Sequence, residues 1–107
     1  MKKVLLIMDR VELIKDLKSV LIEEGFAVIV SMEGQTGLEL AVHEDVDLVI
    51  MDIILPKMDV VTVCRKIKKR KLTLPIIVVT SKPKKGEKAL KLELCADDYI
   101  TEPFSVK

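Results

Sequence analysis

The stretch DLVIMD, residues 47–52, decides the fold class because it is a short apolar run that ends in a carboxylate. The run has the length of a strand, and the residues between its two aspartates are apolar without any alternation with polar ones. Continuous apolar character of this kind is typical of a strand that helices cover on both faces. Since strands covered in this way belong to parallel sheets, we expect DLVIMD to lie inside such a sheet.

Runs of strand length recur on both sides of DLVIMD, and segments of helical period separate them. The other predicted strands are KVLLIM (3–8), FAVIVS (26–31), PIIVVT (75–80) and DYITE (98–102). Strands that alternate with helices form βαβ units, which are joined by right-handed crossovers and build a parallel sheet. We therefore predict an α/β fold with a doubly wound, five-stranded parallel sheet in one domain that spans residues 1–107.

The predicted helices lie between these strands. They cover the apolar stripe from Leu13 to Leu21, GQTGLELAVHE (34–44), VVTVCRKIKKRK (60–71) and KKGEKALKLELC (84–95). The first helix is expected to stop at Glu24-Gly25, because glycine readily takes the left-handed conformation that ends many helices. The chain ends at SVK shortly after the last strand, so a helix that should cover one face of the sheet is expected to be missing.

The composition is typical of a soluble globular domain. The 107 residues are 50% hydrophobic and 33% charged, with a formal net charge of +1. A balanced charge gives no general attraction to nucleic acid or to an anionic membrane. The sequence shows neither an apolar run long enough to span a bilayer nor the pattern of a signal peptide, so we expect a cytoplasmic protein.

The two cysteines, Cys64 and Cys95, stand outside any metal-binding or redox motif. This pattern fits a reducing compartment, in which each is expected to behave as a small buried hydrophobe. A disulfide between them stays an open alternative that nothing in the sequence supports.

Acids and a hydroxyl follow the predicted strands where each one ends. These residues are Asp9, Asp52, Thr80 and Glu102. In a doubly wound sheet ligands bind beyond the carboxyl ends of the strands, so this edge is the candidate site. Clustered carboxylates repel one another unless a cation or a proton joins them, and oxygen ligands suit magnesium. The alternative is that the aspartates only cap helices or end strands in solvent.

Several motifs in combination resemble one family. The segment DLVIMDIILPKMD (47–59), followed in order by VVTS (78–81), CADDY (95–99) and PF (103–104), resembles the receiver domain of two-component response regulators. The resemblance implies a flavodoxin-like fold with strand order 2-1-3-4-5. It also implies a cytoplasmic signalling module of a phosphorelay, not an enzyme, that accepts a phosphoryl group from a sensor histidine kinase or a phosphotransfer protein.

The resemblance assigns roles to individual residues. Asp52 matches the phospho-accepting aspartate, and Thr80 matches the hydroxyl residue that bonds the phosphoryl oxygens. Tyr99 matches the aromatic switch on the last strand. Asp9 and the backbone carbonyl of Ile54 match magnesium ligands that act together with Asp52. Magnesium with fixed donors suits phosphoryl transfer because that reaction depends on placement and charge neutralisation.

Three positions depart from the family pattern. Met8 replaces the first acid of the acidic pair, which should weaken magnesium binding without abolishing it. Glu102 stands where the family has the lysine that pairs with the phosphoryl group, so its charge disfavours a dianionic acyl phosphate. Val60 replaces the glycine after Met58-Asp59 and removes backbone freedom from the loop.

Two accounts of Glu102 compete. In one, Glu102 joins Asp9 and Asp52 around a divalent cation, while Lys57 or Lys82 restores positive charge. In the other, the phosphoryl switch is lost and Glu102 is a tolerated residue at the rim. We favour the second account. The site has lost two of the family's residues, an acid at position 8 and a lysine at position 102, and loss of the phosphoryl function explains both changes more simply than a new metal site built around Glu102.

Three hypotheses about function follow. The leading one is a receiver domain in which phosphorylation of Asp52 is chemically possible but handicapped. An output domain or a homodimer is a further partner, and the binding surface is formed by the fourth helix, the last strand and the neighbouring loop. The alternative is a pseudo-receiver, a protein-interaction module that works without phosphorylation. A metal-dependent phosphatase or hydrolase ranks last, because the sequence lacks a convincing general base and substrate pocket.

The remaining polar features have simpler interpretations. His43 is a surface histidine, since neither nitrogen nor sulfur ligands stand near it in the sequence. The basic tract CRKIKKRK (64–71), which KPKKGEK (82–88) extends, is interpreted as a solvated helix end. Aromatic residues make up only 3% of the chain, so no stacking platform for nucleic acid is evident, and we expect no direct binding of nucleic acid by this domain.

Overall fold

The structure, a computed structural model, describes residues 1–55, 57–80 and 95–101. Strands and helices alternate along the chain as predicted, and each predicted strand agrees with the observed one to within one residue at each described end. The elements are β1 (Lys3–Ile7), α1 (Val11–Glu23), β2 (Ala27–Ser31), α2 (Gly34–His43), β3 (Leu48–Asp52), α3 (Val60–Arg70), β4 (Ile76–Thr80) and β5 (Asp98–Thr101). The helix predicted for residues 84–95 and the end of the chain beyond residue 101 lie outside the described residues, apart from Cys95.

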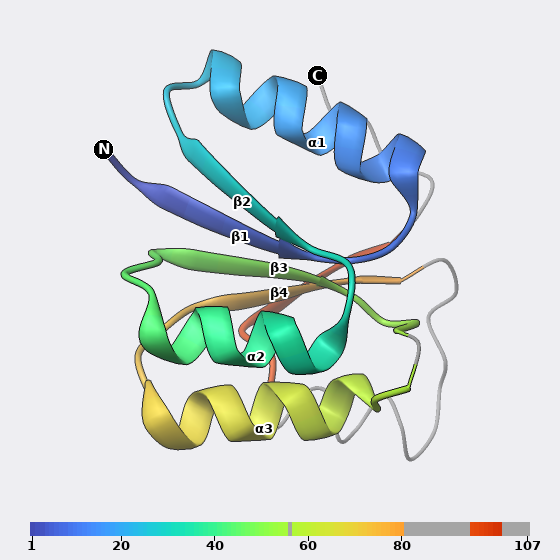
Figure 1. The fold of residues 1–107 in the computed structure, drawn as a ribbon, viewed down its shortest axis with the longest axis vertical. Helices are drawn as coiled ribbons and strands as arrows, with labels where there is room; N and C mark the ends of the chain where they lie inside the picture. The colour runs from blue at the N-terminus through green and yellow to red at the C-terminus, as the bar shows by residue number, and fades with distance from the viewer. Residues whose placement is uncertain (56, 81–94, 102–107) are drawn as a thin grey trace.

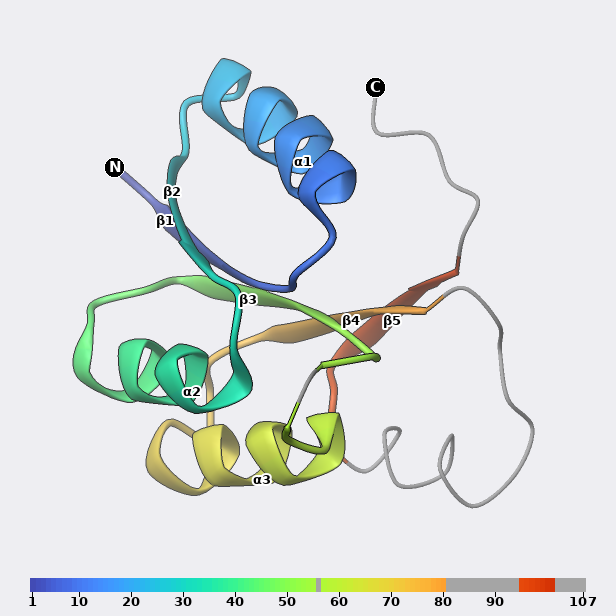
Figure 2. The same ribbon diagram turned by 45° about the vertical axis from the view of Figure 1, so that its right-hand side comes forward.

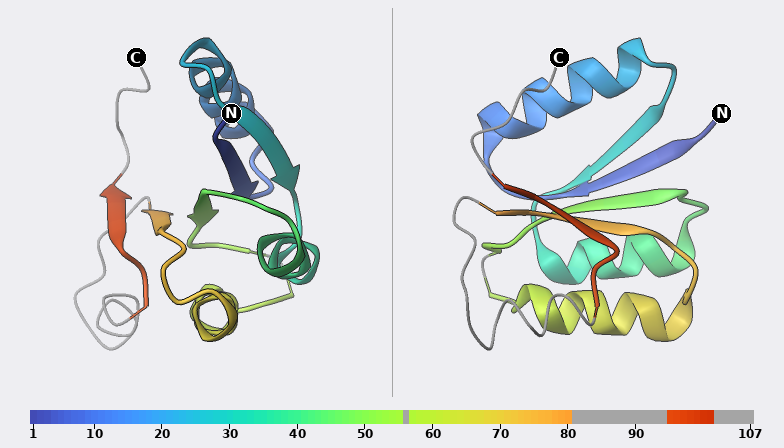
Figure 3. Two further views of the ribbon diagram at one scale, coloured as in Figure 1. Left: turned by 90° about the vertical axis from the view of Figure 1, so that its left-hand side faces the viewer. Right: turned by 180° about the vertical axis from the view of Figure 1, so that it is seen from behind.

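The strands form one parallel sheet in the order β2-β1-β3-β4-β5, which confirms the predicted topology. Helix α1 lies on one face of the sheet, and α2 and α3 lie on the other (Figure 1). Figure 2 and the edge-on view in Figure 3 show the same three layers, with the sheet between the helices. The chain thus changes face after β2, which makes the fold doubly wound.

The strand residues divide between two cores according to the face that they occupy. On β1, Val4 and Leu6 pack into the core under α1, as does Met8 just after the strand, while Leu5 and Ile7 pack toward α2 and α3. On β3, Ile50 joins the α1 side, and Val49 and Met51 join the other. Successive side chains of a strand point to opposite faces, so only a strand covered on both sides becomes apolar throughout. This burial is why DLVIMD lacks alternation.

Helix α1 ends where the sequence predicts. Gly25 has a φ of +92°, in the left-handed region, and its N–H donates to the carbonyl of Ile22. The N–H of Phe26 then donates to the carbonyl of Leu21, which satisfies another carbonyl at the end of the helix. The turn directs the chain straight into β2.

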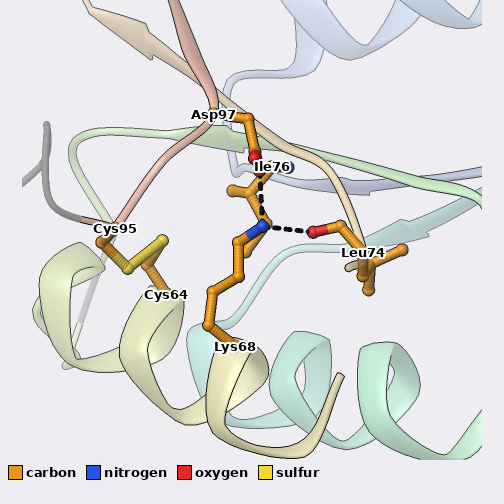
Figure 4. Close-up of a disulfide and its surroundings, with 6 residues drawn as sticks. All are labelled: Cys64, Lys68, Leu74, Ile76, Cys95 and Asp97. Atoms are coloured by element: carbon orange, nitrogen blue, oxygen red, sulfur yellow. Dashed lines mark hydrogen bonds and ion pairs between the residues drawn. A yellow bond between two sulfur atoms is a disulfide. The ribbon is translucent and has the colours of Figure 1, made fainter. Parts of the chain in front are cut away.

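Cys64 and Cys95 form a disulfide that joins α3 to the residues just before β5 (Figure 4). The expectation that both side chains are buried is confirmed, with 0% and 8% exposure. The expectation that they are free thiols is wrong. They are separated by 31 residues, with their Cα atoms 6.0 Å apart, and they meet because α3 packs beside the start of β5.

A second link between the same elements lies one helical turn further along α3. Lys68 Nζ is 2.6 Å from Asp97 Oδ2 and also donates to the carbonyl of Leu74 at 2.7 Å (Figure 4). The same Asp97 oxygen accepts the N–H of Ile76 at 2.7 Å. Burial opposes ionisation of Asp97, but the bonds from Lys68 and Ile76 outweigh it, and the pKa of the carboxyl is lowered.

We predict that this link makes stability depend on pH in the acid range. Since the pKa of Asp97 is lower in the folded state, its stabilisation is complete above the pKa of an unfolded aspartate and is lost as the pH falls through the lowered pKa, below about pH 4. Asp97→Asn keeps an oxygen that can accept from Ile76 but loses the charge, and should cost about 0.5–1 kcal/mol at pH 7 because the pair is partly exposed. Urea unfolding at pH 7 and pH 3 measures this difference, which should shrink at pH 3. A difference that stays constant would contradict the assignment.

Candidate functional site

Asp52, the last residue of β3, is a buried carboxylate with only 2% of its surface exposed. Its Oδ2 atom lies 2.7 Å from Arg10 Nε, and its Oδ1 atom accepts the N–H of Ile54 at 3.2 Å. Both oxygens are therefore engaged. A buried carboxylate needs such partners, since an unpaired charge in this place would cost several kcal/mol.

Arg10 is the residue that the sequence interpretation missed. It stands at the N-cap position of α1, two residues after Met8, and its side chain is 41% exposed at the rim while its Nε reaches the buried carboxylate. The strand pairing Ile7↔Met51 brings the end of β1 beside the end of β3, which puts Arg10 within reach of Asp52. The signal in the sequence was a cation immediately after Asp9 in MDR, where the interpretation considered only acids.

The sheet register places most of the predicted site residues at the carboxyl edge. Asp52 pairs with Val79, the neighbour of Thr80, and Thr80 pairs with Thr101 at the end of β5. Asp9 is exposed in the connection between β1 and α1. The edge therefore holds Asp9, Asp52 and the backbone of Thr80 together, while Glu102 and Lys82 lie outside the described residues.

Tyr99 and Val60 pack in the core on the α2 and α3 side of the sheet. Tyr99 is on β5, half-buried, and packs against the core on the α3 side of the sheet. Val60 is the first residue of α3 and is 1% exposed. Lys57, in the loop before α3, has a φ of +66°, in the left-handed region. The loss of loop freedom expected at Val60 stays a prediction.

Met8 is fully buried, at 0% exposure, in the core under α1. The position that the sequence comparison aligned with a family acid is thus a packed apolar side chain. Among residues 1–55, 57–80 and 95–101, no three acidic, histidine or cysteine side chains cluster in a way that would hold a metal ion. With Arg10 bound to Asp52, the donors present fit at most a weak magnesium site formed by Asp9, Asp52 and the Ile54 carbonyl.

The simpler interpretation of the aspartates as helix caps receives no support in the described part of the chain. The N-cap residues of α1, α2 and α3 are Arg10, Glu33 and Asp59, and none makes a side-chain capping bond. Asp52 ends a strand and contacts Arg10 instead. Its place is explained by the charge pair at the sheet edge.

Two lysines of the basic tract at the end of α3 form bonds to neighbouring segments of the domain. Lys68 joins Asp97 and the Leu74 carbonyl, and Lys71 Nζ donates to the carbonyl of Glu44 at 2.7 Å. Arg65, Lys66, Lys69 and Arg70 on the same helix are exposed. His43 is exposed at the end of α2, in agreement with the sequence interpretation.

A five-stranded parallel doubly wound domain with a buried aspartate at the carboxyl end of its central strand is the architecture of a receiver domain. Residues 4–107 match the model of the response regulator receiver domain family, and the chain belongs to that family. Receiver domains are signalling modules of two-component systems, and they interact with histidine kinases or phosphotransfer proteins and with output domains.

Individual relatives agree with this assignment. The chain is 39% identical to the alkaline phosphatase synthesis transcriptional regulatory protein PhoP of Bacillus subtilis (strain 168), over 97% of this chain and 43% of that protein. It is 40% identical to the transcriptional regulatory protein YclJ of the same organism, over 96% and 45%. A CheY-like receiver domain protein from Methanospirillum hungatei JF-1 superposes with a TM-score of 0.91 at 27% identity, over 99% and 85%. The chain thus spans less than half the length of these curated relatives.

No helix in the described ranges is long and apolar enough to cross a membrane.

Proposed function

We propose that this domain accepts a phosphoryl group on Asp52 from a sensor histidine kinase or a phosphotransfer protein in the cytoplasm, and passes the signal to an output domain or to a second copy of the chain. The observation that carries the proposal is the buried Asp52 carboxylate at the sheet edge, paired with Arg10 and with the Ile54 N–H. The domain acts here as a signalling module and not as a metabolic enzyme, and it does not itself bind nucleic acid.

The transfer requires an oxygen nucleophile and compensation of negative charge. An oxygen of Asp52 attacks the phosphorus of a phosphohistidine, the new O–P bond forms as the P–N bond breaks, and the histidine nitrogen leaves with the electron pair. Magnesium held by Asp9, Asp52 and the Ile54 carbonyl would supply charge neutralisation. Thr80 on β4 would hydrogen-bond the phosphoryl group, and Tyr99 on β5 would act as the aromatic switch.

A phosphorylation-independent pseudo-receiver is the second candidate, and one contact favours it. The ion pair between Arg10 and Asp52 gives the acceptor carboxylate a charged partner from the protein itself. In that case partner binding alone would set the output.

We predict that a small-molecule phosphodonor such as phosphoramidate, with millimolar magnesium, adds one phosphoryl group to the wild-type chain. Asp52→Asn should abolish the adduct, because an amide oxygen is a far weaker nucleophile than a carboxylate. Intact-mass spectrometry measures the adduct, and its loss in hydroxylamine identifies an acyl phosphate. Asp45→Asn, at an exposed aspartate after α2, is the matched control and should be modified like the wild type. The absence of an adduct on the wild type would favour the pseudo-receiver.

A further inference from the structure

We infer that Arg10 is a built-in counter-charge for Asp52 that competes with magnesium for the same carboxylate oxygen. The inference deepens the proposed function, because it concerns the state of the proposed acceptor. In this inference the charge of Arg10 lowers the affinity of the site for magnesium.

The contact between the two residues is close and charged. Arg10 Nε lies 2.7 Å from Asp52 Oδ2, within the range of a charge-assisted hydrogen bond. Asp52 is 2% exposed, so solvent screens its charge poorly, whereas the Arg10 side chain is 41% exposed and extends to the rim. The arginine therefore neutralises a buried anion and still has access to solvent into which it can withdraw.

The other residues around Asp52 also fit a site in which the Arg10 guanidinium, and not a metal ion, is the cation. Met8 occupies the place of an acid and is fully buried, which removes one magnesium ligand from the end of β1. The other oxygen of Asp52 accepts the Ile54 N–H, so Oδ2 is the oxygen for which a cation would compete. The carboxylate thus has one guanidinium and one backbone N–H as partners from the protein itself.

A magnesium ion on Oδ2 would lie within a few ångströms of the guanidinium unless Arg10 moved away. The repulsion between a divalent ion and a unit charge at such a distance, even with strong solvent screening, corresponds to a loss of affinity of about tenfold or more. If Arg10 moves away instead, magnesium binding must break the bond to Asp52. In both cases the charge of Arg10 weakens magnesium binding.

The test measures magnesium binding without any phosphodonor, by amide NMR titration of the wild type and of three variants. Arg10→Gln should bind magnesium at least about tenfold more tightly than the wild type, because the competing charge is gone. Arg10→Lys keeps the charge and should stay close to the wild type. Lys15→Gln removes an exposed cation from the same helix and should change the affinity less than about twofold.

An Arg10→Gln variant that binds magnesium as weakly as the wild type, or more weakly, would overturn the inference. If this variant fails to fold, the same comparison is made with Arg10→Met, and with Arg10→Lys as the charge-retaining reference. The result is independent of phosphorylation. If Arg10→Gln binds magnesium about tenfold more tightly but the wild type forms no phosphoryl adduct, the inference stands and the proposed function is refuted. If the wild type forms the adduct but Arg10→Gln binds magnesium no more tightly, the proposed function stands and the inference is refuted.

Discussion

Reducing the disulfide between Cys64 and Cys95 is expected to lower the free energy of unfolding by about 3–4 kcal/mol. The bond closes a segment of 31 residues, and releasing it restores the conformational freedom of that segment in the unfolded chain. Both sulfur atoms belong to buried residues, so the reduced thiols stay in the core and the loss comes mainly from the unfolded state. For a domain of this size the melting temperature should fall by more than about 10 °C.

Urea unfolding with and without a phosphine reductant measures this loss. Thiol titration in denaturant first establishes that both cysteines are bonded in the starting material and free afterwards. The double variant Cys64→Ala/Cys95→Ala provides the control, because its midpoint should not respond to the reductant. A wild-type midpoint that is the same before and after complete reduction would show that the cross-link contributes nothing to stability.

Met8→Asp is expected to destabilise the domain by about 2–4 kcal/mol in a chelator, and magnesium should restore part of this loss. Met8 is fully buried among apolar residues of the core under α1, where a carboxylate would lose hydration and packing together. It also lies directly after the β1 residue that pairs with Met51, so the new acid would stand beside Asp52 and repel it. A divalent cation bound between the two carboxylates removes that repulsion.

Thermal unfolding in EDTA and in millimolar magnesium separates the two effects. Met8→Leu conserves size and apolarity, so it should cost less than about 1.5 kcal/mol and should respond to magnesium no more than the wild type does. Magnesium should stabilise Met8→Asp more than it stabilises Met8→Leu or the wild type. If Met8→Asp were as stable as the wild type in EDTA, the buried position of this side chain at the site would be wrong.

Local patterns were sufficient to predict the layers of the fold. The unbroken apolar run of DLVIMD follows from burial on both faces, and Gly25 ends α1 because its φ is positive. The register that brings Asp52 and Thr80 to one edge follows from the parallel pairing of strands of similar length. Each of these features depends on residues that are close in sequence or on a general rule for parallel sheets.

Two contacts that sequence reasoning missed, the disulfide and the Arg10–Asp52 ion pair, depend on tertiary packing. Cys64 and Cys95 belong to no spacing motif, and their pairing becomes visible only when α3 lies beside the start of β5. Arg10 reaches Asp52 across the turn between β1 and α1, and the long side chain of an arginine permits many other directions. Asp52 can be predicted from its place at the end of a strand, whereas its partner Arg10 cannot.

The most direct test of the central claim is a two-dimensional amide NMR titration with magnesium and then with magnesium and phosphoramidate, on the wild type and on Asp52→Asn. If Asp52 is the phosphoacceptor, the phosphodonor should shift the amides of Asp9, Ile54, Thr80 and Tyr99 in the wild type and leave them unchanged in Asp52→Asn. If the wild-type spectrum stays unchanged, or if both proteins shift alike, Asp52 is not the acceptor and the domain signals without phosphorylation at this site.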